Sequence, residues 1–330
     1  MAQEQGSTVT QDSTFGELEQ YEGEFTEGSR RKRQFNKWKD TLSEHWGLLV
    51  EDRLVVFGMA TIGFFVLVAI AAPYLAPYGQ TERLFDDMGM IAQWEPPVWA
   101  GGEYFLGTTA EGYHIFSQLI YGSRPALIVG LTAAFFTATI GTTVALISGY
   151  YGGYVDDFLM RIVDVAYGLP LLPTVILMVA VLGPSYVNVI IAVVILQWRS
   201  PARVIRSQVL SIRERSYVRS ARVAGATDWR IISRHIAPNV LPLTFLYGAF
   251  AVAWAILTEA GVSFLGLGDP SQVSWGTMLQ SAHTYNSMVH GAWYWFIPPG
   301  ICIALVVISA FLIGRGYEEV TNPQLRSMGR

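Results

Sequence analysis

Long apolar stretches separated by short polar segments dominate the chain after its first fifty residues. Five of them contain no Asp, Glu, Lys or Arg, and each is long enough for a membrane span, which needs about 20 apolar residues. These stretches cover residues 54–81, 125–155, 165–198, 236–258 and 270–314. The whole chain is 52% hydrophobic and 15% charged, which is too apolar for an ordinary soluble domain. The pattern predicts an all-α integral membrane protein.

The number of spans depends on the stretch 165–198, which Gly183 and Pro184 interrupt. This stretch is too short for two complete spans, so both must extend beyond it if both cross the bilayer. That extension brings Arg161, Asp164 and Arg199 toward the ends of spans. We expect six transmembrane helices, at residues 54–76, 125–149, 158–182, 185–210, 240–265 and 293–314.

Orientation follows from the cationic residues, because loops rich in Lys and Arg stay in the cytoplasm. With both termini inside, 20 of the 22 Lys and Arg residues are cytoplasmic, and only Arg83 and Arg124 are outside. We therefore expect a multi-pass protein of the cell membrane with both termini in the cytoplasm. The expected organisation is a disordered tail, acidic then basic (1–50), a first span with an external loop (51–124), a five-helix core (125–314) and a cytoplasmic tail (315–330).

The largest cytoplasmic loop, residues 211–239, has the sequence signals of two short helices. Ser216 is a suitable N-cap for the first, and Gly225 suits a left-handed end. Thr227 or Asp228 would cap the second, and Pro238 is expected to break the chain before the next span. A compact helical projection into the cytoplasm is predicted.

The segment Arg219-Ser220-Ala221-Arg222-Val223-Ala224-Gly225, followed by Pro238, resembles the EAA loop of binding-protein-dependent ABC importers. In that family the loop is a coupling helix that docks into a groove of an ATPase subunit. The resemblance implies that the coupling residues are Ser216, Tyr217, Arg219, Ser220, Ala221, Arg222, Gly225 and Asp228. Arg219 stands where the family usually has glutamate, so the capping box with Ser216 is lost. We expect an acidic site on the partner ATPase to compensate.

Four further stretches carry the same resemblance, which covers nearly all of the chain after Arg53. They are residues 105–108 with 122–124, 149–156, 161–170, and 257–268 with 274–276. They are most similar to the C-type permease subunit of dipeptide and oligopeptide importers, which implies a type I ABC importer permease (MetI-like) fold. Relatives usually have an acidic residue near Thr109 and an Arg-Asp pair at Tyr113 and His114, and this sequence departs from both.

The resemblance also implies a transport subunit that is not an enzyme and binds no cofactor. ATP and Mg would belong to two cytoplasmic ATPase subunits. A homologous second permease, an external substrate-binding protein and the lipid bilayer would be the other partners, and no nucleic acid is expected. Peptide is the implied substrate, and nickel complexes and oligosaccharides are carried by similar permeases.

Four residues are candidates for the pathway or its gate: Glu259, Asp164, Ser263 and Phe264. A carboxylate such as Glu259 near the end of an apolar span is costly and usually faces protein or water, so a structural role is equally open. Asp164 is expected to pair with Arg161 on one helix face, because they are three residues apart. Four arginines recur at helical spacing and are interpreted as a solvated, headgroup-facing side, with a site for acidic substrate as the alternative: Arg199, Arg203, Arg206 and Arg213.

Other functions lack their sequence signals. No Lys follows Lys39, so the membrane portion has no Walker A loop. Clear inverted repeats and mid-membrane ion-binding carboxylates, common in secondary transporters, are not found. The sequence has no Ser-containing GxSxG or HExxH within a span, and the scattered histidines have no metal-ligand spacing, so neither a hydrolase nor a metal site is expected. The lone cysteine, Cys302, cannot form an intramolecular disulfide.

Overall fold

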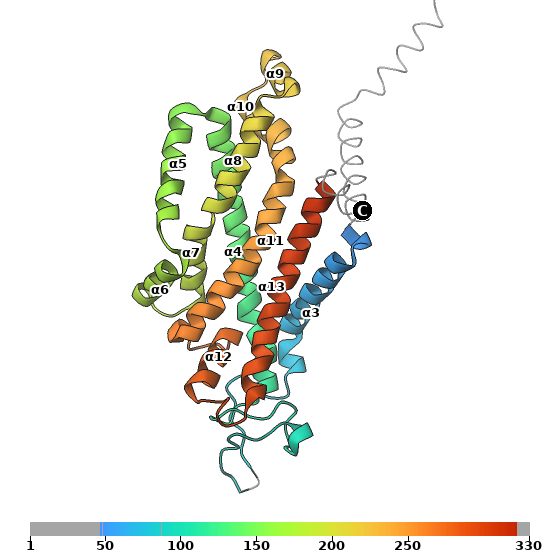
Figure 1. Cartoon of the computed structure of the whole chain (residues 1–330), viewed down its shortest axis with the longest axis vertical. Helices are drawn as coiled ribbons and strands as arrows, with labels where there is room; N and C mark the ends of the chain where they lie inside the picture. Colours follow the sequence, from blue (N-terminus) through green and yellow to red (C-terminus); the bar gives the residue numbers. More distant parts are fainter. Residues whose placement is uncertain (1–46, 48, 87, 322–330) are drawn as a thin grey trace, which may run out of the picture. The chain divides into compact units, whose positions relative to one another are not determined.

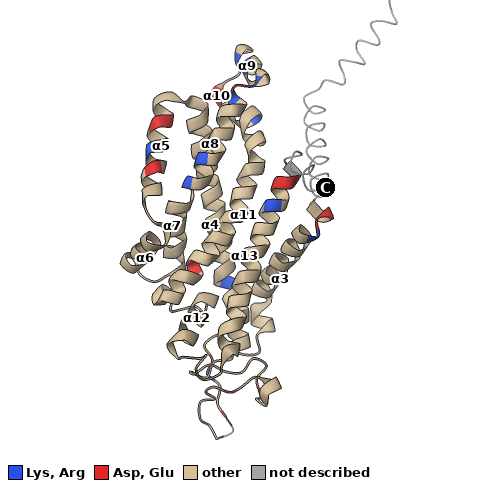
Figure 2. Cartoon of the chain, viewed as in Figure 1, with Lys and Arg blue, Asp and Glu red and all other residues tan. Residues whose placement is uncertain are grey.

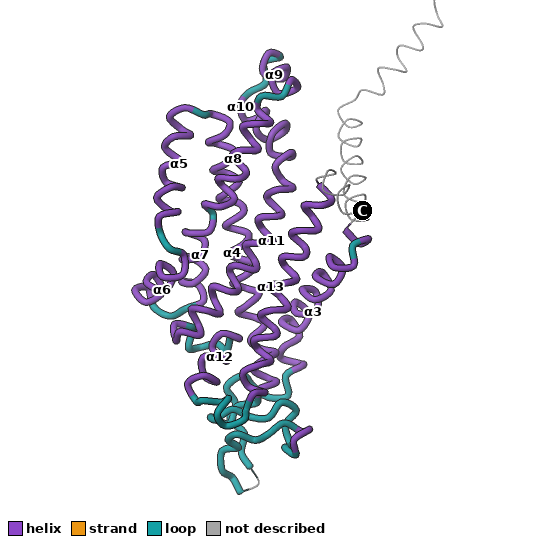
Figure 3. The backbone as a smooth tube through the Cα atoms, in the orientation of Figure 1, coloured by secondary structure: helices purple, strands orange, loops and turns teal. Residues whose placement is uncertain are grey.

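The computed structural model describes residues 47, 49–86 and 88–321 (Figure 1). The chain divides into two units, Met1–Glu51 and Asp52–Arg330, and the fold below is that of the second unit. Its described residues form helices and loops, with isolated β-bridges in the loop before α4 (Figure 3). The expected tail at 1–50 lies almost wholly outside the described residues, as do residues 322–330. The prediction of an all-α membrane protein is confirmed.

Five helical stretches of the described chain are long and apolar enough to cross a membrane, and each overlaps an expected span. The first is α3 (Arg53–Leu75), and the second is α4 (Ile115–Tyr151), which begins well before the expected residue 125. The third joins α7 (Tyr186–Gln197) to α8 (Arg199–Arg213). The fourth runs from α10 (Asp228–Ile231) through α11 (Ala237–Val262), and the fifth lies in α13 (Trp293–Thr321).

The expected span at 158–182 is not one straight helix. It consists of α5 (Gly153–Gly168) and α6 (Leu171–Leu182), which meet at an angle of 87°. Pro170 causes the break, because proline has no N–H to donate and excludes the helical conformation from the residue before it. Leu169 accordingly has φ −89° and ψ 123°, in the extended region. This part of the bundle therefore turns a corner between two short helices.

Helices α4 and α11 form the centre of the bundle, with α8 packed on α4, and with α13 and α3 beyond α11 (Figure 1). Glycines on α4 allow this close packing. An added Cβ at Gly130 would lie 2.8 Å from Ile256, and one at Gly149 would lie 2.6 Å from Val209. Small residues at such contacts are typical of membrane helices, where van der Waals contact drives association. Larger residues at these two positions would force α4 away from α11 and α8.

Arg124 of α4 joins α3 to this core. Pro73 within α3 cannot donate a hydrogen bond to the carbonyl of Ala69, four residues before it. Arg124 supplies the missing donor, because its Nε lies 2.6 Å from the oxygen of Ala69. An unsatisfied carbonyl in hydrocarbon costs several kcal/mol, so this bond removes a large local penalty. The same bond ties the first span to the second.

Charged residues are unevenly distributed over the described helices. They gather toward the end of the bundle that carries α9 (Ser216–Val223), while long stretches of the other helices carry none (Figure 2). At the opposite end, the loop between α3 and α4 folds on itself through the isolated bridges Arg83–Tyr113 and Thr108–His114. The two ends of the bundle thus differ in composition as well as in form.

Candidate functional site: a helical knob and two cavities

Helices α9 and α10 form the projection that the sequence predicts, and we call residues 216–231 the knob. Gly225 ends α9 in the left-handed conformation, with φ 79° and its N–H bonded to the carbonyl of Arg222. Thr227 caps α10 by accepting from the N–H of Arg230 at 3.4 Å. Both predictions are confirmed. The proposed Ser216 cap is wrong, because the helix begins one residue earlier: Arg215 is the N-cap and Ser216 already lies in the first turn.

The expected break at Pro238 is also wrong. The chain continues from α10 through a π-helical turn, Ile232–Ile236, into α11 without leaving the helical conformation. In the π turn the N–H of Ala237 donates to the carbonyl of Ile232, five residues earlier. Pro238 is the second residue of α11 and follows this π turn directly, so the change in hydrogen-bond spacing falls where proline has no N–H to donate. The knob and α11 are therefore mechanically continuous.

Apolar side chains fix the underside of the knob. Val218 and Ile231 are fully buried and belong to one cluster with Ile205 and Ile212 of α8. The outer side of the knob is different, because Val223 is 91% exposed and Trp229 76% exposed. The predicted coupling residues Ser216, Tyr217, Arg219, Ser220, Arg222, Gly225 and Asp228 are exposed, and Ala221 is half-buried. A rigid base thus presents an open, partly apolar and cationic surface.

Arg219 has a carboxylate partner within the chain. Its Nη2 donates to Oε2 of Glu214 at 2.7 Å, and Arg213 contacts the other oxygen at 3.3 Å. The guanidinium of Arg219, with that of Arg213, holds the pKa of the Glu214 carboxyl below its usual range. Glu214 is therefore ionised at neutral pH. It provides a nearer compensation for Arg219 than the acidic site expected on another subunit.

Polar contacts attach the knob to the end of α4. The hydroxyl of Tyr150 donates to Oδ1 of Asp228 at 2.6 Å, and the guanidinium of Arg222 lies 5.6 Å from the centre of the Tyr150 ring. Arg213 Nη1 donates to the carbonyls of Gly149 and Tyr150, at 3.0 and 3.2 Å. These carbonyls belong to the last turn of α4, where no following helical turn supplies N–H donors for them. Displacement of the knob must therefore move α4 or break the bond between Tyr150 and Asp228, while Arg213 ties the adjoining end of α8 to the same turn of α4.

The arginines of α8 contact neighbouring helices rather than forming the expected solvated side. Arg206 makes a bidentate ion pair with Asp156 of α5, and Arg199 donates to the carbonyls of Ala166 and Leu169 at the end of α5. Arg203 donates to Asp164. The expected pair between Asp164 and Arg161 is therefore wrong, since the partner comes from α8 instead of the same helix. Together with Arg213, these side chains bind α8 to α5 and α4.

At the opposite end of the bundle, Glu259 lies buried in α11 and accepts a hydrogen bond from Ser263 at 2.7 Å. Close packing surrounds this pair: a Cβ on Gly276, in α12 (Trp275–Thr284), would lie 2.7 Å from Cβ of Ser263. The indole of Trp275 is buried and donates to the carbonyl of Leu119 at 2.9 Å. Glu259 is thus enclosed by this chain's own residues.

The four candidate pathway residues do not form one site. Ser263 lines a polar cavity of about 340 Å³ at this end, together with Glu111 and Asp269. Phe264 is half-buried, and its ring lies 5.5 Å from that of His283. Asp164 lies on α5 and is bonded to α8, so it belongs to another part of the molecule. Of the four, Glu259 and Ser263 are joined by a side-chain hydrogen bond.

The departures from the family pattern in the loop between α3 and α4 are structurally accommodated. Thr109 is buried and accepts from the N–H of Tyr113 at 3.0 Å. His114 takes the N-cap of α4, where its Nδ1 accepts from the N–H of Ser117 at 3.3 Å, and it lies edge-on to Tyr78 and Tyr104. Burial lowers the pKa of His114 to about 4, so the ring is neutral at pH 7.

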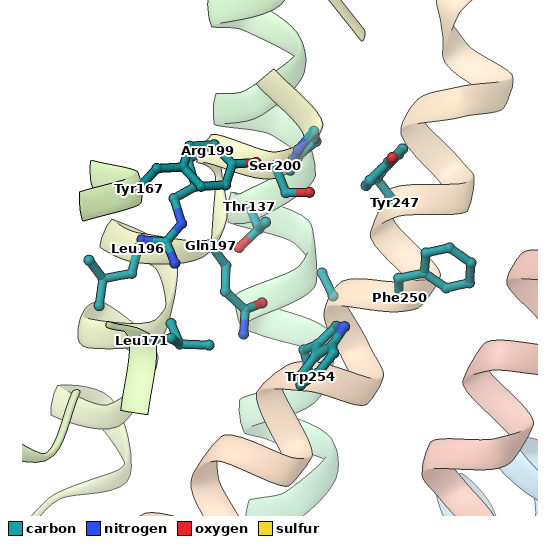
Figure 4. A pocket seen from close by; sticks show the side chains of 12 residues that line it. Thr137, Tyr167, Leu171, Leu196, Gln197, Arg199, Ser200, Tyr247, Phe250 and Trp254 are labelled. Atoms are coloured by element: carbon teal, nitrogen blue, oxygen red, sulfur yellow. The ribbon is translucent and has the colours of Figure 1, made fainter. Parts of the chain in front are cut away.

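Sequence reasoning missed a second cavity of about 340 Å³ in the middle of the bundle (Figure 4). Thr137 of α4, Gln197 of α7 and Trp254 of α11 line it, among others. A Gln at the end of an apolar helix was a usable signal, but the sequence does not show that three helices meet there. No group of three or more His, Cys, Asp or Glu that could hold a metal occurs among the described residues.

Comparison with known proteins agrees with this architecture. Residues 141–327 match the model of the family described as "Binding-protein-dependent transport system inner membrane component", and residues 40–97 match "N-terminal TM domain of oligopeptide transport permease C". The chain is 31% identical to the dipeptide transport system permease protein DppC of Bacillus subtilis (strain 168), covering 85% of each chain.

Two further relatives have similar coverage. The DppC protein of Haemophilus influenzae is 32% identical, over 87% of this chain and 96% of its own length. The glutathione transport system permease protein GsiD of Pectobacterium atrosepticum is 35% identical, over 86% of this chain and 91% of its own length. The chain belongs to the family of binding-protein-dependent transport system inner membrane components, and is a permease subunit rather than an enzyme.

Proposed function

We propose that this chain is the C-type permease of an importer that carries dipeptides or oligopeptides, powered by separate ATPases that dock on the knob. The main support for this proposal is the structure of the knob, whose buried base and bond to α4 make it rigid enough to transmit force. Its permease relatives are named for dipeptide and glutathione transport, which supports a peptide substrate. Nickel complexes and oligosaccharides remain the alternative cargo.

The proposed assembly has a homologous second permease beside this chain, two ATPase subunits that bind ATP and Mg on the cytoplasmic side, and a substrate-binding protein outside. Both termini and the knob are cytoplasmic, because that orientation keeps 20 of the 22 Lys and Arg residues inside. The loop between α3 and α4, together with α12, then faces the binding protein.

The exposed surface of the knob suits an acidic groove with an apolar floor. Trp229 is an exposed side chain of the kind that anchors protein interfaces, and the exposed Val223 adds apolar area beside it. Exposed arginines surround them on both short helices: Arg215, Arg219, Arg222 and Arg230. Charge complementarity with the groove would guide association, and the two apolar residues would supply much of the affinity.

The test replaces Val223 with Asp and measures how much ATPase co-purifies with the permease assembly. We expect a several-fold loss, because a carboxylate would enter an apolar or acidic groove. Val289→Asp is the matched control, since Val289 is 84% exposed in the loop before α13, at the other end of the bundle. Equal ATPase recovery for both variants, with peptide uptake intact, would disprove docking at the knob.

A further inference from the structure

The central cavity has features of a binding site that the permease function does not by itself require. It lies about halfway along α4 and α11, and α5 and α8 close its other side (Figure 4). Its volume, about 340 Å³, is within the range of small-molecule sites. Tyr167, Tyr247 and Trp254 supply aromatic walls, and Trp254 is 52% exposed, so the cavity is open at one edge.

Two buried polar groups at this cavity lack hydrogen-bond partners. Thr137 is 1% exposed and its hydroxyl bonds to no protein atom, and the buried Nε2 of Gln197 is in the same state. Thr142, one and a half turns along the same helix, instead bonds to Thr244 at 2.9 Å. Burying a polar group without a partner costs free energy, so such groups usually face water or a ligand.

The main chain adds an acceptor at the same place. Pro201 lines the cavity and has no N–H, so the carbonyl of Gln197 loses its helical donor four residues on. Gln197 therefore offers a hydrogen-bond donor in its side-chain Nε2 and a hydrogen-bond acceptor in its main-chain carbonyl. A peptide bond needs this combination, because it presents one N–H and one C=O.

Among the residues that the structure describes, Arg199 is the only charged side chain that lines the cavity, and no Asp or Glu does. Arg199 gives one nitrogen, Nη1, to the carbonyls of Ala166 and Leu169, and its guanidinium lies 5.0 Å from the Tyr167 ring. A guanidinium has five N–H donors, so others remain for a bidentate contact with a carboxylate. The cavity therefore suits an anionic end group beside a neutral amide.

We propose that the central cavity binds a short peptide, with its main-chain amide at Gln197 and Thr137 and its C-terminal carboxylate at Arg199. The aromatic walls receive one apolar side chain of the peptide. This site rests on the proposed function, because it is the place within the bundle where the transported peptide would bind. Water alone would also satisfy the two polar groups, and the experiment separates the two cases.

The experiment measures binding of radiolabelled Ala-Phe to the purified assembly of this chain, the second permease and both ATPases, without binding protein. Thr137→Val and Gln197→Leu should each weaken binding by roughly tenfold, since a site built for hydrogen bonds discriminates strongly. Both should keep or raise the melting temperature, because they remove an unpaired buried group. Thr142→Val should do the reverse: lower melting temperature with unchanged binding.

Three results would overturn the site: no saturable binding of Ala-Phe, unchanged affinity in both cavity variants, or an equal loss in Thr142→Val. Ala-Phe amide should bind more weakly than Ala-Phe, and equal affinity would remove the carboxylate contact. ATP-driven uptake of Ala-Phe by the wild-type assembly with its binding protein is measured in parallel. Uptake without cavity binding refutes this site alone, whereas absence of uptake refutes the proposed peptide transport.

Discussion

The end of the bundle that carries the knob and the end that carries α12 are held together by different kinds of contact. At the knob end, arginines of α8 bind carboxylates and carbonyls of α4 and α5, and several of these groups are partly exposed. At the other end, Trp275 and the Glu259–Ser263 pair are buried against closely packed glycines.

The difference teaches which end can move. Ion pairs near water are remade at little net cost, because each charge regains water when the pair opens. Interdigitated packing has only discrete arrangements, since a small shift leaves voids or overlaps. We infer that a force on the knob shifts the ionic end while the α12 end stays a fixed support.

The largest expected effect comes from breaking the packed end. Trp275→Ala should destabilise the chain by about 3 to 5 kcal/mol, because it leaves a cavity where a fully buried indole packs. The melting temperature in detergent should fall markedly. Trp229→Ala is the matched control: that indole is 76% exposed on the knob, so its loss should leave the melting temperature unchanged. Similar shifts for both tryptophans would contradict the comparison.

A smaller effect is expected at the ionic end. Arg206→Met should cost about 1 to 3 kcal/mol, because it removes the partner of the Asp156 side chain, which is only 13% exposed. Asp156→Leu combined with Arg206→Met should recover most of that loss, since no unpaired charge remains. Melting temperatures of the two single variants and the double variant form the cycle. Additive losses would mean that the two side chains stabilise the fold independently.

The smallest effect should be a pH dependence of stability that arises in the loop between α3 and α4. Burial lowers the pKa of His114 to about 4, below the unfolded value of about 6.5. The contribution of His114 to the free energy of unfolding is therefore complete above about pH 6.5. It declines as pH falls toward 4, because the unfolded chain then binds a proton at His114 more readily than the folded chain does. His114→Asn, which keeps an N-cap acceptor but does not titrate, should lose less stability between pH 7 and pH 5. Identical declines would exclude His114 as the cause.

The sequence predicts the spans well because a membrane span is a local property. Charge-free runs such as 125–155 identify helices without knowledge of their neighbours, and Gly225 and Thr227 mark helix ends through their own backbone preferences. The partners of charged residues are not local. Arg161 and Asp164 satisfy the helix-spacing rule, yet Asp164 bonds to Arg203, which only the packing of α8 on α5 brings near.

The sharp turn at Leu169–Pro170 lies between these cases. The proline is visible in the sequence, but an expectation of uninterrupted spans masks it. The central cavity was not predictable, because Thr137, Gln197 and Trp254 come from three helices that are far apart in sequence.

The position of Arg199 at the end of α5 has a wider structural meaning. Helix α5 ends just before Pro170, where the last carbonyls lack α-helical donors and need another partner; that of Ala166 accepts from the N–H of Leu169 at 3.3 Å. A single guanidinium from the neighbouring segment takes that role, by reaching the carbonyls of Ala166 and Leu169. Lysine would be a poor substitute, because it lacks the planar guanidinium that faces the Tyr167 ring at 5.0 Å while Nη1 serves both carbonyls. A cation placed at a corner thus lets a polypeptide change direction while the carbonyls of the corner stay paired.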